Sequence, residues 1–466
     1  AWAPSDESGK STWRTYAYTN TATASAVGPD GQWHETVLGL LTAGEILLDD
    51  ISVIENPGGG AVEFVQNGSF ESDTVGTMPD KWRIIGTHRH SEVIVDPDNG
   101  ANKVLRLVAT GPTETMHNHA ETTHAGGETV VNGRDYAISF KAKWITGSRQ
   151  LHTRLYFNRC AQVTVLDAPL TIGTPGAVNR SYATNIGPTY AEFIHGPAVP
   201  AVSAPVTVSV TARDPDGVAA MTNWYCVNEG TWVASAMTDQ GNGRYTATIP
   251  GQAASAIVQF YVEGRDSLGA VSTFPAAGID SHALYRHDDG EAAGNGLHNF
   301  RVIMKDSDQT WLHEHINVMS DDRLGSTVIY NEEDIYYNTG ARLKGGERGR
   351  WNAPTAGYLI GFNADRPFLG VHETVRAERS EPVSKRRREI LLKLVMNHAG
   401  GSLSRYSDLV KFMAPNPSYN SVAELRLASF GDEFLDNQFD NGADGGLFKA
   451  ELIYYPRNTD DGSPEG

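Results

Sequence analysis

RLKGGERGRWNAPTAGYLIGFNADRPFLGVHETVRAERSEPVSKRRREILLKLVMNHAGGSLSRYSDLVK, residues 342–411, passes from a glycine-rich basic segment through apolar strands into a helix. The basic side chains bracket the glycines Gly345, Gly346 and Gly349 and belong to Arg342, Lys344, Arg348 and Arg350. Glycine lets the backbone approach a ligand closely, so the segment predicts a site for an anion such as a phosphate.

The second half of this stretch predicts a helix from about Ser384 to His398, ended by two glycines at 400–401. One face of the helix is formed by Leu391, Leu394, Val395 and His398. Glu389 lies one turn into the helix, where it can pair with a lysine on a neighbouring strand. A solvated hairpin with a helix packed beneath it has the same spacing, so the spacing alone leaves both interpretations open.

A resemblance extends over residues 298–457, which contain HNFRVIMKDSD, TVIYNEEDIYYNTGARLKGGERGR, REILLKLVMNHAGG and GGLFKAELIYYP. These strings resemble the N-terminal part of a CotH-type kinase domain, in the version found in large secreted proteins of planctomycete-type bacteria. The resemblance implies an α+β lobe over 295–466 that uses ATP and Mg²⁺. By it Lys344 would orient the phosphates and Glu389 would hold that lysine, with Arg342 and Arg348 as further nucleotide candidates.

Two departures weaken this assignment. Gly346 stands where the family has a serine, and the catalytic and metal-binding aspartates of the family lie further downstream than Gly466. No catalytic residue is therefore assigned, and the sequence leaves open whether the protein is an enzyme.

Length and charge limit the classes of protein that are possible. A chain of 466 residues is too long for one core and predicts three or four domains. The formal net charge of −18 argues against a nucleic-acid partner. No segment has the ~20 apolar residues of a membrane span. The residues from Ala1 lack the basic and then apolar pattern of a leader, so we expect that any leader has been removed or was not included. Cys160 and Cys226 fall in different predicted domains, so we expect two buried free thiols.

The N-terminal residues alternate with the period of a strand and predict β-sandwiches. VLGLLTAGEILLDDISVIE resembles the closing strands of a jelly-roll carbohydrate-binding module, so residues 1–55 are expected to be the C-terminal part of one. FVQNGSFESD and MPDKWRIIGTHRHSEV resemble the start of a second, which would occupy 61–167.

Residues 168–188 are rich in glycine and proline and predict a linker. The strands of 189–287, separated by Asp-Gly and Pro-Gly turns, predict a sandwich of immunoglobulin or fibronectin type III kind. The expected fold class is therefore mainly β and multidomain, with a C-terminal α+β lobe.

Calcium is the expected structural ion. Jelly-roll modules of the kind resembled here often hold one Ca²⁺, and the resemblance implies Asn67 and Glu71 as ligands with Asp167 closing the site. Asp214 and Asp216 of the DPDG string are a second candidate, although such a string is also a common β-turn.

Two further groups of residues each allow more than one interpretation. His117 and His119 would point the same way from a strand, which suits one metal ion such as zinc, a sugar contact, or a pair of surface histidines. Aromatic rings stack on sugars while polar side chains bind the hydroxyl groups, and core packing is the alternative for any single ring. The carbohydrate candidates are Trp82, Trp144, Arg154, Tyr156 and Asn158.

The sequence thus favours a secreted or cell-surface bacterial protein, of the extracellular-matrix type, that binds carbohydrate or a cell-surface protein. An extracellular CotH-like kinase, with its catalytic lobe beyond Gly466, is the alternative. A glycoside-processing enzyme is a third, because binding modules commonly accompany such enzymes.

Overall fold

The computed structural model describes most of the chain. The described residues are 11–23, 35–112, 117–156, 159–169, 178, 182–292, 294, 296–345, 350, 355–379, 383–399, 404, 406–427, 434–436, 439–444, 457–458 and 464–465. The chain divides into two compact units. The first comprises Ala1–Tyr182, Met319–Asp322 and Glu451–Gly466, and the second comprises Ala183–Val318 and Arg323–Ala450.

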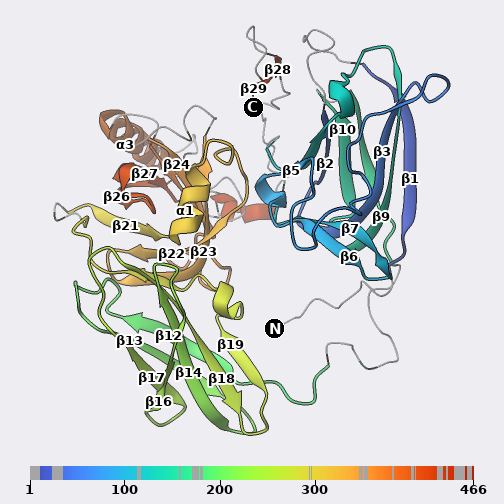
Figure 1. Cartoon of the computed structure of the whole chain (residues 1–466). Helices are drawn as coiled ribbons and strands as arrows, with labels where there is room; N and C mark the ends of the chain where they lie inside the picture. The colour runs from blue at the N-terminus through green and yellow to red at the C-terminus, as the bar shows by residue number, and fades with distance from the viewer. Residues whose placement is uncertain are drawn as a thin grey trace. The chain divides into compact units, whose positions relative to one another are not determined.

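The first unit contains a sandwich of two antiparallel sheets, drawn in blue and teal in Figure 1. Sheet A has the order β1 (Arg14–Thr21), β9 (Asp135–Gly147), β3 (Gly44–Glu55), β7 (Asn99–Ala109), β6 (Glu92–Asp96), with β4 (Val62–Glu63) paired to β3. Sheet B has the order β11 (Arg159–Val165), β10 (Gln150–Leu155), β2 (Glu35–Leu40), β8 (Ala120–Thr123), β5 (Trp82–Ile84).

One hydrophobic core lies between these sheets, and it includes Leu48 of β3, Phe140 of β9 and Leu151 of β10. The prediction of a separate module in 1–55 is therefore wrong for the described strands. Strand β3 pairs with β9 and β7, while β2 pairs with β10 and β8. Strands β2 and β3 occupy the middle of the two sheets, because they pair with segments that are distant in sequence.

The second unit begins with another two-sheet sandwich, drawn in green in Figure 1. One sheet has the order β12 (Thr189–Gly196), β13 (Val206–Arg213), β17 (Arg244–Ile249), β16 (Thr238–Asp239). The other has the order β15 (Val233–Ala236), β14 (Val218–Val227), β18 (Ile257–Asp266), β19 (Val271–Phe274), with β20 (Leu284–Arg286) also on β18. Val208, Phe260 and Val262 pack between the sheets.

A closed barrel of seven strands follows in the same unit. Its order is β21 (His298–Ile303), β22 (Leu324–Tyr330), β23 (Asp334–Lys344), β24 (Gly357–Gly361), β25 (Thr374–Glu378), β27 (Ser421–Arg426), β26 (Ser407–Met413). Parallel pairing of β21 with β26 closes the barrel, which removes free strand edges. The expected mainly β, multidomain class is confirmed, but the expected α+β lobe is not: its described residues form this barrel with two α-helices, α1 (Asp306–His313) and α3 (Val383–Ala399).

The remaining elements are short. They are η1 (Gly86–His88), η2 (Ala125–Gly127), η3 (Gly278–Asp280), η4 (Pro417–Tyr419), η5 (Gly442–Asp444) and the pair β28 (Arg457–Asn458) and β29 (Pro464–Glu465). Among the described helices, none is long and apolar enough to cross a membrane. Cys160 and Cys226 are both buried and free.

Candidate functional site

The outer face of sheet B carries charged and polar side chains, whereas its inner face is apolar. Along β10, Leu151 and Leu155 belong to the core. Successive side chains of a strand point to opposite faces, so His152 and Arg154 point outward. The same alternation along β2 places Leu38 and Leu40 inside.

A row of outward residues crosses four strands of sheet B. Arg154 of β10 lies opposite Val37 of β2, which lies opposite Glu121 of β8. Glu121 in turn lies opposite Arg83 of β5. Directly opposed residues of antiparallel strands share a face, so these side chains are neighbours. Together with outward residues two positions along the strands, they form what we call the polar face: Glu35, Arg83, His119, Glu121, His152, Arg154 and Tyr156.

Glu121 is held from two sides. His119 Nε2 lies 2.6 Å from Glu121 Oε2, and the Arg83 guanidinium pairs with the other carboxylate oxygen. The Glu121 side chain is only 10% exposed, whereas that of Arg83 is 53% exposed. The polar face therefore reaches solvent at its β5 side, where a ligand can approach Arg83.

The two carboxyl groups of the polar face differ in acidity. Burial raises the pKa of Glu35 to about 7, and the nearby Glu121 carboxylate adds to this effect. Burial also acts to raise the pKa of Glu121, but hydrogen bonding and charge from His119 and Arg83 outweigh it and lower the pKa. Near pH 6, Glu35 thus retains its proton while Glu121 is ionised.

The remaining titratable groups of the polar face show the effect of burial too. Burial lowers the pKa of His152 to about 4, with the Arg154 charge adding to the shift. Burial also lowers the pKa of His119, although Glu121 opposes the change. Burial raises the pKa of Tyr156 to about 12. At neutral pH the imidazole groups of His119 and His152 and the phenol group of Tyr156 are therefore uncharged. They can donate hydrogen bonds to ligand hydroxyl groups or accept hydrogen bonds from them.

The structure separates the predicted carbohydrate residues into two groups. Arg154 and Tyr156 belong to the polar face, but Trp82 and Trp144 belong to the core and are 4% and 8% exposed. The indole N–H groups of these tryptophans donate to Asn67 O and Gly147 O, at 3.0 Å and 3.2 Å. Both rings therefore pack inside the sandwich and cannot stack on a sugar. Asn158 lies outside the described residues.

Sequence reasoning did not select Glu35, Arg83, Glu121 or His152. Glu121 could have been predicted from the sequence. It stands two positions after His119 in the string HAETT, and residues two apart on a strand share a face. Glu35 gives no such signal, since its importance depends on the register that places β2 beside β8.

The residues proposed for calcium in the first sandwich have separate partners. Asn67 Nδ2 donates to Asp73 Oδ2 at 2.8 Å, and Asp167 pairs with Arg14 at 3.3 Å. Lys103 Nζ donates to the backbone carbonyl oxygen of Glu71 at 2.9 Å and to that of Asp73 at 2.6 Å. The lysine ammonium thus supplies the positive charge to the carbonyl groups of this loop, so the loop does not fit a calcium ion.

The second sandwich contains three aspartates that could hold a metal ion. Ligand atoms of Asp214, Asp216 and Asp266 lie within 4.8 Å of one another, and this is the one group of its kind found in the described parts of the chain. Hydrogen bonds from Asn185 and from backbone N–H groups of 268–270 lower the pKa of Asp266, although desolvation opposes the change. The DPDG string thus forms a turn, with Asp216 N donating to Asp214 Oδ1 at 2.8 Å, and also contributes to this group.

The histidine pair does not enter such a group. His119 bonds to Glu121, as described above, while His117 lies in the turn before β8. The interpretation that the structure favours for His119 is therefore a contact within the polar face.

The predicted pair of Lys344 and Glu389 is not formed. Lys344 on β23 pairs instead with Glu378 on β25. Glu389 on α3 pairs with Lys393 at 2.7 Å and with Arg426 at 2.9 Å. A strand glutamate is closer to the lysine because Lys344 and Glu378 project over the same face of the barrel. Arg342 is buried and donates to Leu343 O at 3.2 Å, and Arg348 lies outside the described residues.

Ion pairs among Glu389, Lys393 and Arg426 hold α3 against the barrel. Glu424 of β27 completes a ring of charges, because it accepts from Lys393 at 2.5 Å and lies 3.4 Å from Arg426. We call Glu389, Lys393, Glu424 and Arg426 the charge ring. The predicted helix is present, but the apolar face that contains Leu391 is exposed, with 63% of that side chain accessible.

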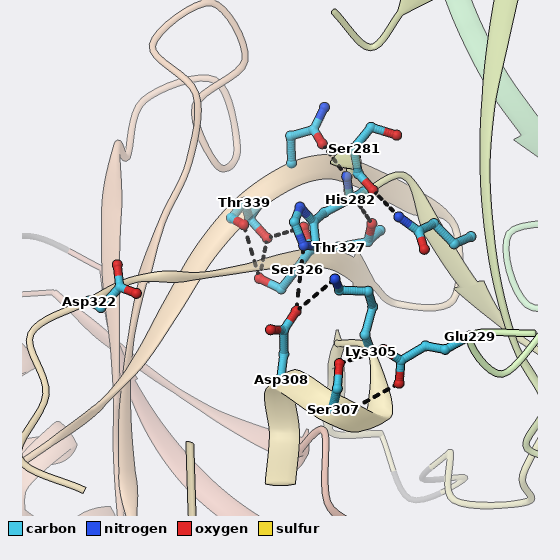
Figure 2. Close-up of polar contacts among 12 residues, drawn as sticks. Glu229, Ser281, His282, Lys305, Ser307, Asp308, Asp322, Ser326, Thr327 and Thr339 are labelled. Atoms are coloured by element: carbon cyan, nitrogen blue, oxygen red, sulfur yellow. Dashed lines mark hydrogen bonds and ion pairs between the residues drawn. The ribbon is translucent and has the colours of Figure 1, made fainter. Parts of the chain in front are cut away.

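A second polar cluster joins α1, the barrel and the connector before β20, as Figure 2 shows. His282 Nε2 lies 3.5 Å from Asp308 Oδ2 of α1, while Ser326 of β22 bonds to Thr339 Oγ1 at 2.8 Å. A serine, a histidine and an aspartate therefore lie near one another. Ser326 is fully buried and, among the contacts of the described residues, does not bond to His282. The cluster therefore fits a structural joint and not a nucleophile site.

Comparisons with known proteins complete the description. No protein-family model matches the chain, and no curated protein matches it in sequence. Among solved structures, the chain is similar to the crystal structure of a Br derivative of BhCBM56, with 13% identity, a TM-score of 0.15, and 23% of this chain and 96% of that chain covered.

Two pullulanases are also similar. One is the pullulanase from Anoxybacillus sp. LM18-11 complexed with maltotriose, with 10% identity, a TM-score of 0.15, and 56% of this chain and 27% of that chain covered. The other is from Bacillus acidopullulyticus, with 8% identity, a TM-score of 0.14, and 60% and 36% covered. The chain thus spans about a third or less of these enzymes, and TM-scores this low carry no argument about its function.

Proposed function

We propose that this protein is a secreted or cell-surface modular protein that binds carbohydrate on the polar face of its N-terminal sandwich. The observation that carries the proposal is the outward row of Arg83, Glu121 and Arg154 across sheet B, bordered by a carboxyl group that burial keeps protonated. Buried charges are costly to maintain for stability alone, so a cluster of them on an outer face suits ligand recognition.

The chemistry of the polar face fits neutral polysaccharides best. Guanidinium groups donate hydrogen bonds, carboxylates accept them, and the imidazole and phenol groups do either. The charge of Glu121 offsets one of the two arginine charges and protonated Glu35 carries none, so the polar face has only a small positive net charge and does not select a strongly charged ligand. An array of donors and acceptors without large net charge matches the hydroxyl groups of a glycan.

The test is binding of the full chain to neutral soluble polysaccharides, measured by affinity electrophoresis and calorimetry. Replacing a charged partner of a hydrogen bond costs about 1.5–3 kcal/mol, so Arg83→Ala and Arg154→Ala should weaken binding roughly 10- to 100-fold. Arg106→Ala is the matched control, because Arg106 projects from the outer face of sheet A, where it pairs with Glu45 at 2.8 Å. Unchanged binding in both polar-face variants, or loss in the control, would contradict the proposal.

Nucleotide binding in the manner of a CotH-type kinase is the second candidate. One observation favours it: Lys344 does form an ion pair with a glutamate, and Gly345 follows it with a φ of 106°. Under this candidate the chain would bind ATP with Mg²⁺, and Lys344→Met would abolish that binding. A protein partner at the cell surface is the further outcome if neither polysaccharide nor nucleotide binds.

The expected structural calcium ion is assigned to the second sandwich in this proposal, at Asp214, Asp216 and Asp266. Carboxylate oxygens are the ligands that Ca²⁺ prefers. A calcium-dependent rise of Tm that Asp216→Asn removes, and Glu71→Gln does not, is the expected result.

A further inference from the structure

We propose that Glu35 and Glu121 act as an acid–base pair that hydrolyses a glycosidic bond of the polysaccharide on the polar face. The inference rests on the carbohydrate binding proposed above and adds an activity to it. A single carboxylate is enough to bind a hydroxyl group of a sugar. Cleavage of a glycosidic bond needs two carboxyl groups, one protonated and one ionised.

The strand register places the two side chains at a workable separation. Glu35 of β2 lies opposite Thr123 of β8, and Glu121 stands two residues before Thr123 on the same strand. The two glutamates are therefore diagonal neighbours on one face, with Cβ atoms roughly 7 Å apart. From Cβ atoms at this spacing the two side chains can place their carboxyl groups about 6.5–9.5 Å apart, a separation that leaves room for a water molecule and is typical of inverting glycosidases.

Their surroundings assign the two roles. Glu121 accepts from His119 Nε2 and pairs with Arg83, and both contacts favour its ionised form. Glu35 lies at the start of β2 beside this negative charge and away from bulk water, which favours its protonated form. Two carboxyl groups whose environments separate their acidities are the arrangement that acid–base hydrolysis requires.

The reaction then balances without a further reactant. Glu35 gives its proton to the glycosidic oxygen as the bond from that oxygen to the anomeric carbon breaks. Glu121 takes a proton from water, whose oxygen bonds to the anomeric carbon on the opposite side. One water molecule is consumed, the product has an inverted anomeric centre, and exchange with solvent restores both carboxyl groups. His119 is a positioning residue, since its hydrogen bond orients Glu121.

The experiment uses the full chain with pullulan, laminarin and xylan as probes. Release of reducing ends and binding are measured on the same samples, and far-UV circular dichroism checks the fold of each variant. General acid and base groups contribute about 10²–10⁴-fold each, so Glu35→Gln and Glu121→Gln should lower hydrolysis by that factor and retain binding within about tenfold. Glu45→Gln, on the outer face of sheet A, is the matched control and should leave both unchanged.

His119 is tested by the shape of the pH profile. Hydrolysis by the unmodified chain should fall as pH rises through about 7, where Glu35 loses its proton. His119→Leu, which has no hydrogen-bond donor, should raise the lower limit of the active pH range, because Glu121 then protonates at higher pH.

Each outcome has a distinct meaning. Binding of a probe without hydrolysis overturns this inference and leaves the carbohydrate-binding function standing. Absence of both binding and hydrolysis overturns both. Hydrolysis that survives in Glu35→Gln and Glu121→Gln, or a product with retained configuration, also overturns the acid–base pair described here.

Discussion

Lys344 reaches past strand β24 to pair with Glu378 on β25, and the residue opposite Lys344 on the intervening strand is Gly357. A Cβ atom at Gly357 would lie 3.0 Å from Lys344 Cγ and 3.1 Å from Ala377 O. The glycine therefore provides the space through which the lysine side chain passes. Lys344, the lysine of the segment that suggested a phosphate site, is thus held within the barrel by a neighbouring strand.

Gly357→Ala should destabilise the second unit. The added methyl group must displace Lys344 or the β25 backbone, and overpacking of this kind typically costs about 1–3 kcal/mol. Calorimetric unfolding should show a lower Tm for this variant. Gly100→Ala is the matched control, because nothing lies within 4 Å of a Cβ built there. An unchanged Tm for Gly357→Ala would show that the space at Gly357 is not needed.

Lys344→Met distinguishes the two roles considered for this lysine. The substitution leaves Glu378 with Arg426, 3.7 Å away, so we expect a loss of about 1–3 kcal/mol in the free energy of unfolding. Polysaccharide binding should not change. ATP binding measured by calorimetry should be absent from both the unmodified chain and the variant. Binding that is present and lost in Lys344→Met would instead support the kinase candidate.

Glu35→Gln should alter stability in a pH-dependent way. The pKa of Glu35 is raised from 4.5 to about 7, so the folded protein binds this proton more tightly than the unfolded chain. The resulting stabilisation is fully present below about pH 4.5 and is lost as pH rises through about 7. Glutamine cannot ionise, and the variant should match the unmodified chain near pH 5.

At pH 8 the same variant should be more stable, by up to about 3 kcal/mol, because it avoids a buried charge beside Glu121. Thermal unfolding at the two pH values measures the difference. Glu45→Gln controls for the loss of a glutamate elsewhere. Equal Tm differences at pH 5 and pH 8 would contradict the raised pKa.

Gly325→Ala should loosen the joint between the second sandwich and the barrel. A Cβ atom there would lie 2.2 Å from His282 Cγ, so the imidazole must leave its place against β22. Its contact with Asp308 and the bond from Thr327 Oγ1 to His282 O, 2.7 Å long, would weaken together. We expect faster proteolysis near 276–282, whereas Ser326→Ala, which only removes a buried hydrogen bond to Thr339, should have a smaller effect.

Lys103→Met should destabilise the first unit. The carbonyl group of buried Asp73 loses its ammonium partner, which costs about 1–3 kcal/mol, whereas that of exposed Glu71 can bind water instead. Thermal unfolding with and without added Ca²⁺ measures the result. Stabilisation of the unmodified chain by Ca²⁺ that Lys103→Met increases would mean that the ion and the lysine compete for one place.

The sequence predicted the kinds of element better than their partners. Alternation and turn residues indicated β-sandwiches, and the predicted helix from Ser384 to His398 corresponds to α3, Val383–Ala399. The separate first module was wrong because alternation within 1–55 does not reveal that β2 and β3 pair with strands formed by 120–155. Pairing between distant segments depends on long-range register, which local pattern does not contain.

Only part of the candidate site could be predicted, because local pattern does not show which strands lie side by side. Alternation along β10 assigns Arg154 and Tyr156 to one face, but the similar pattern of β9 gives no indication that Trp144 faces the core. His119 was found because histidines stand out in the sequence. Glu35 was missed, because an ordinary glutamate becomes unusual only when folding brings another carboxylate beside it and removes water.

The central position of β2 and β3 in their sheets also affects how the chain is made. Leu40 of β2 pairs with Leu151, and Val53 of β3 pairs with Ile138. During synthesis the apolar sides of both early strands must wait until their partners leave the ribosome, and such long-range pairing is slow and exposed to aggregation. A nascent chain arrested before residue 135 can pair β3 with β7 and β2 with β8, but the edges of β3 and β2 that pair with β9 and β10 would stay open to chaperones.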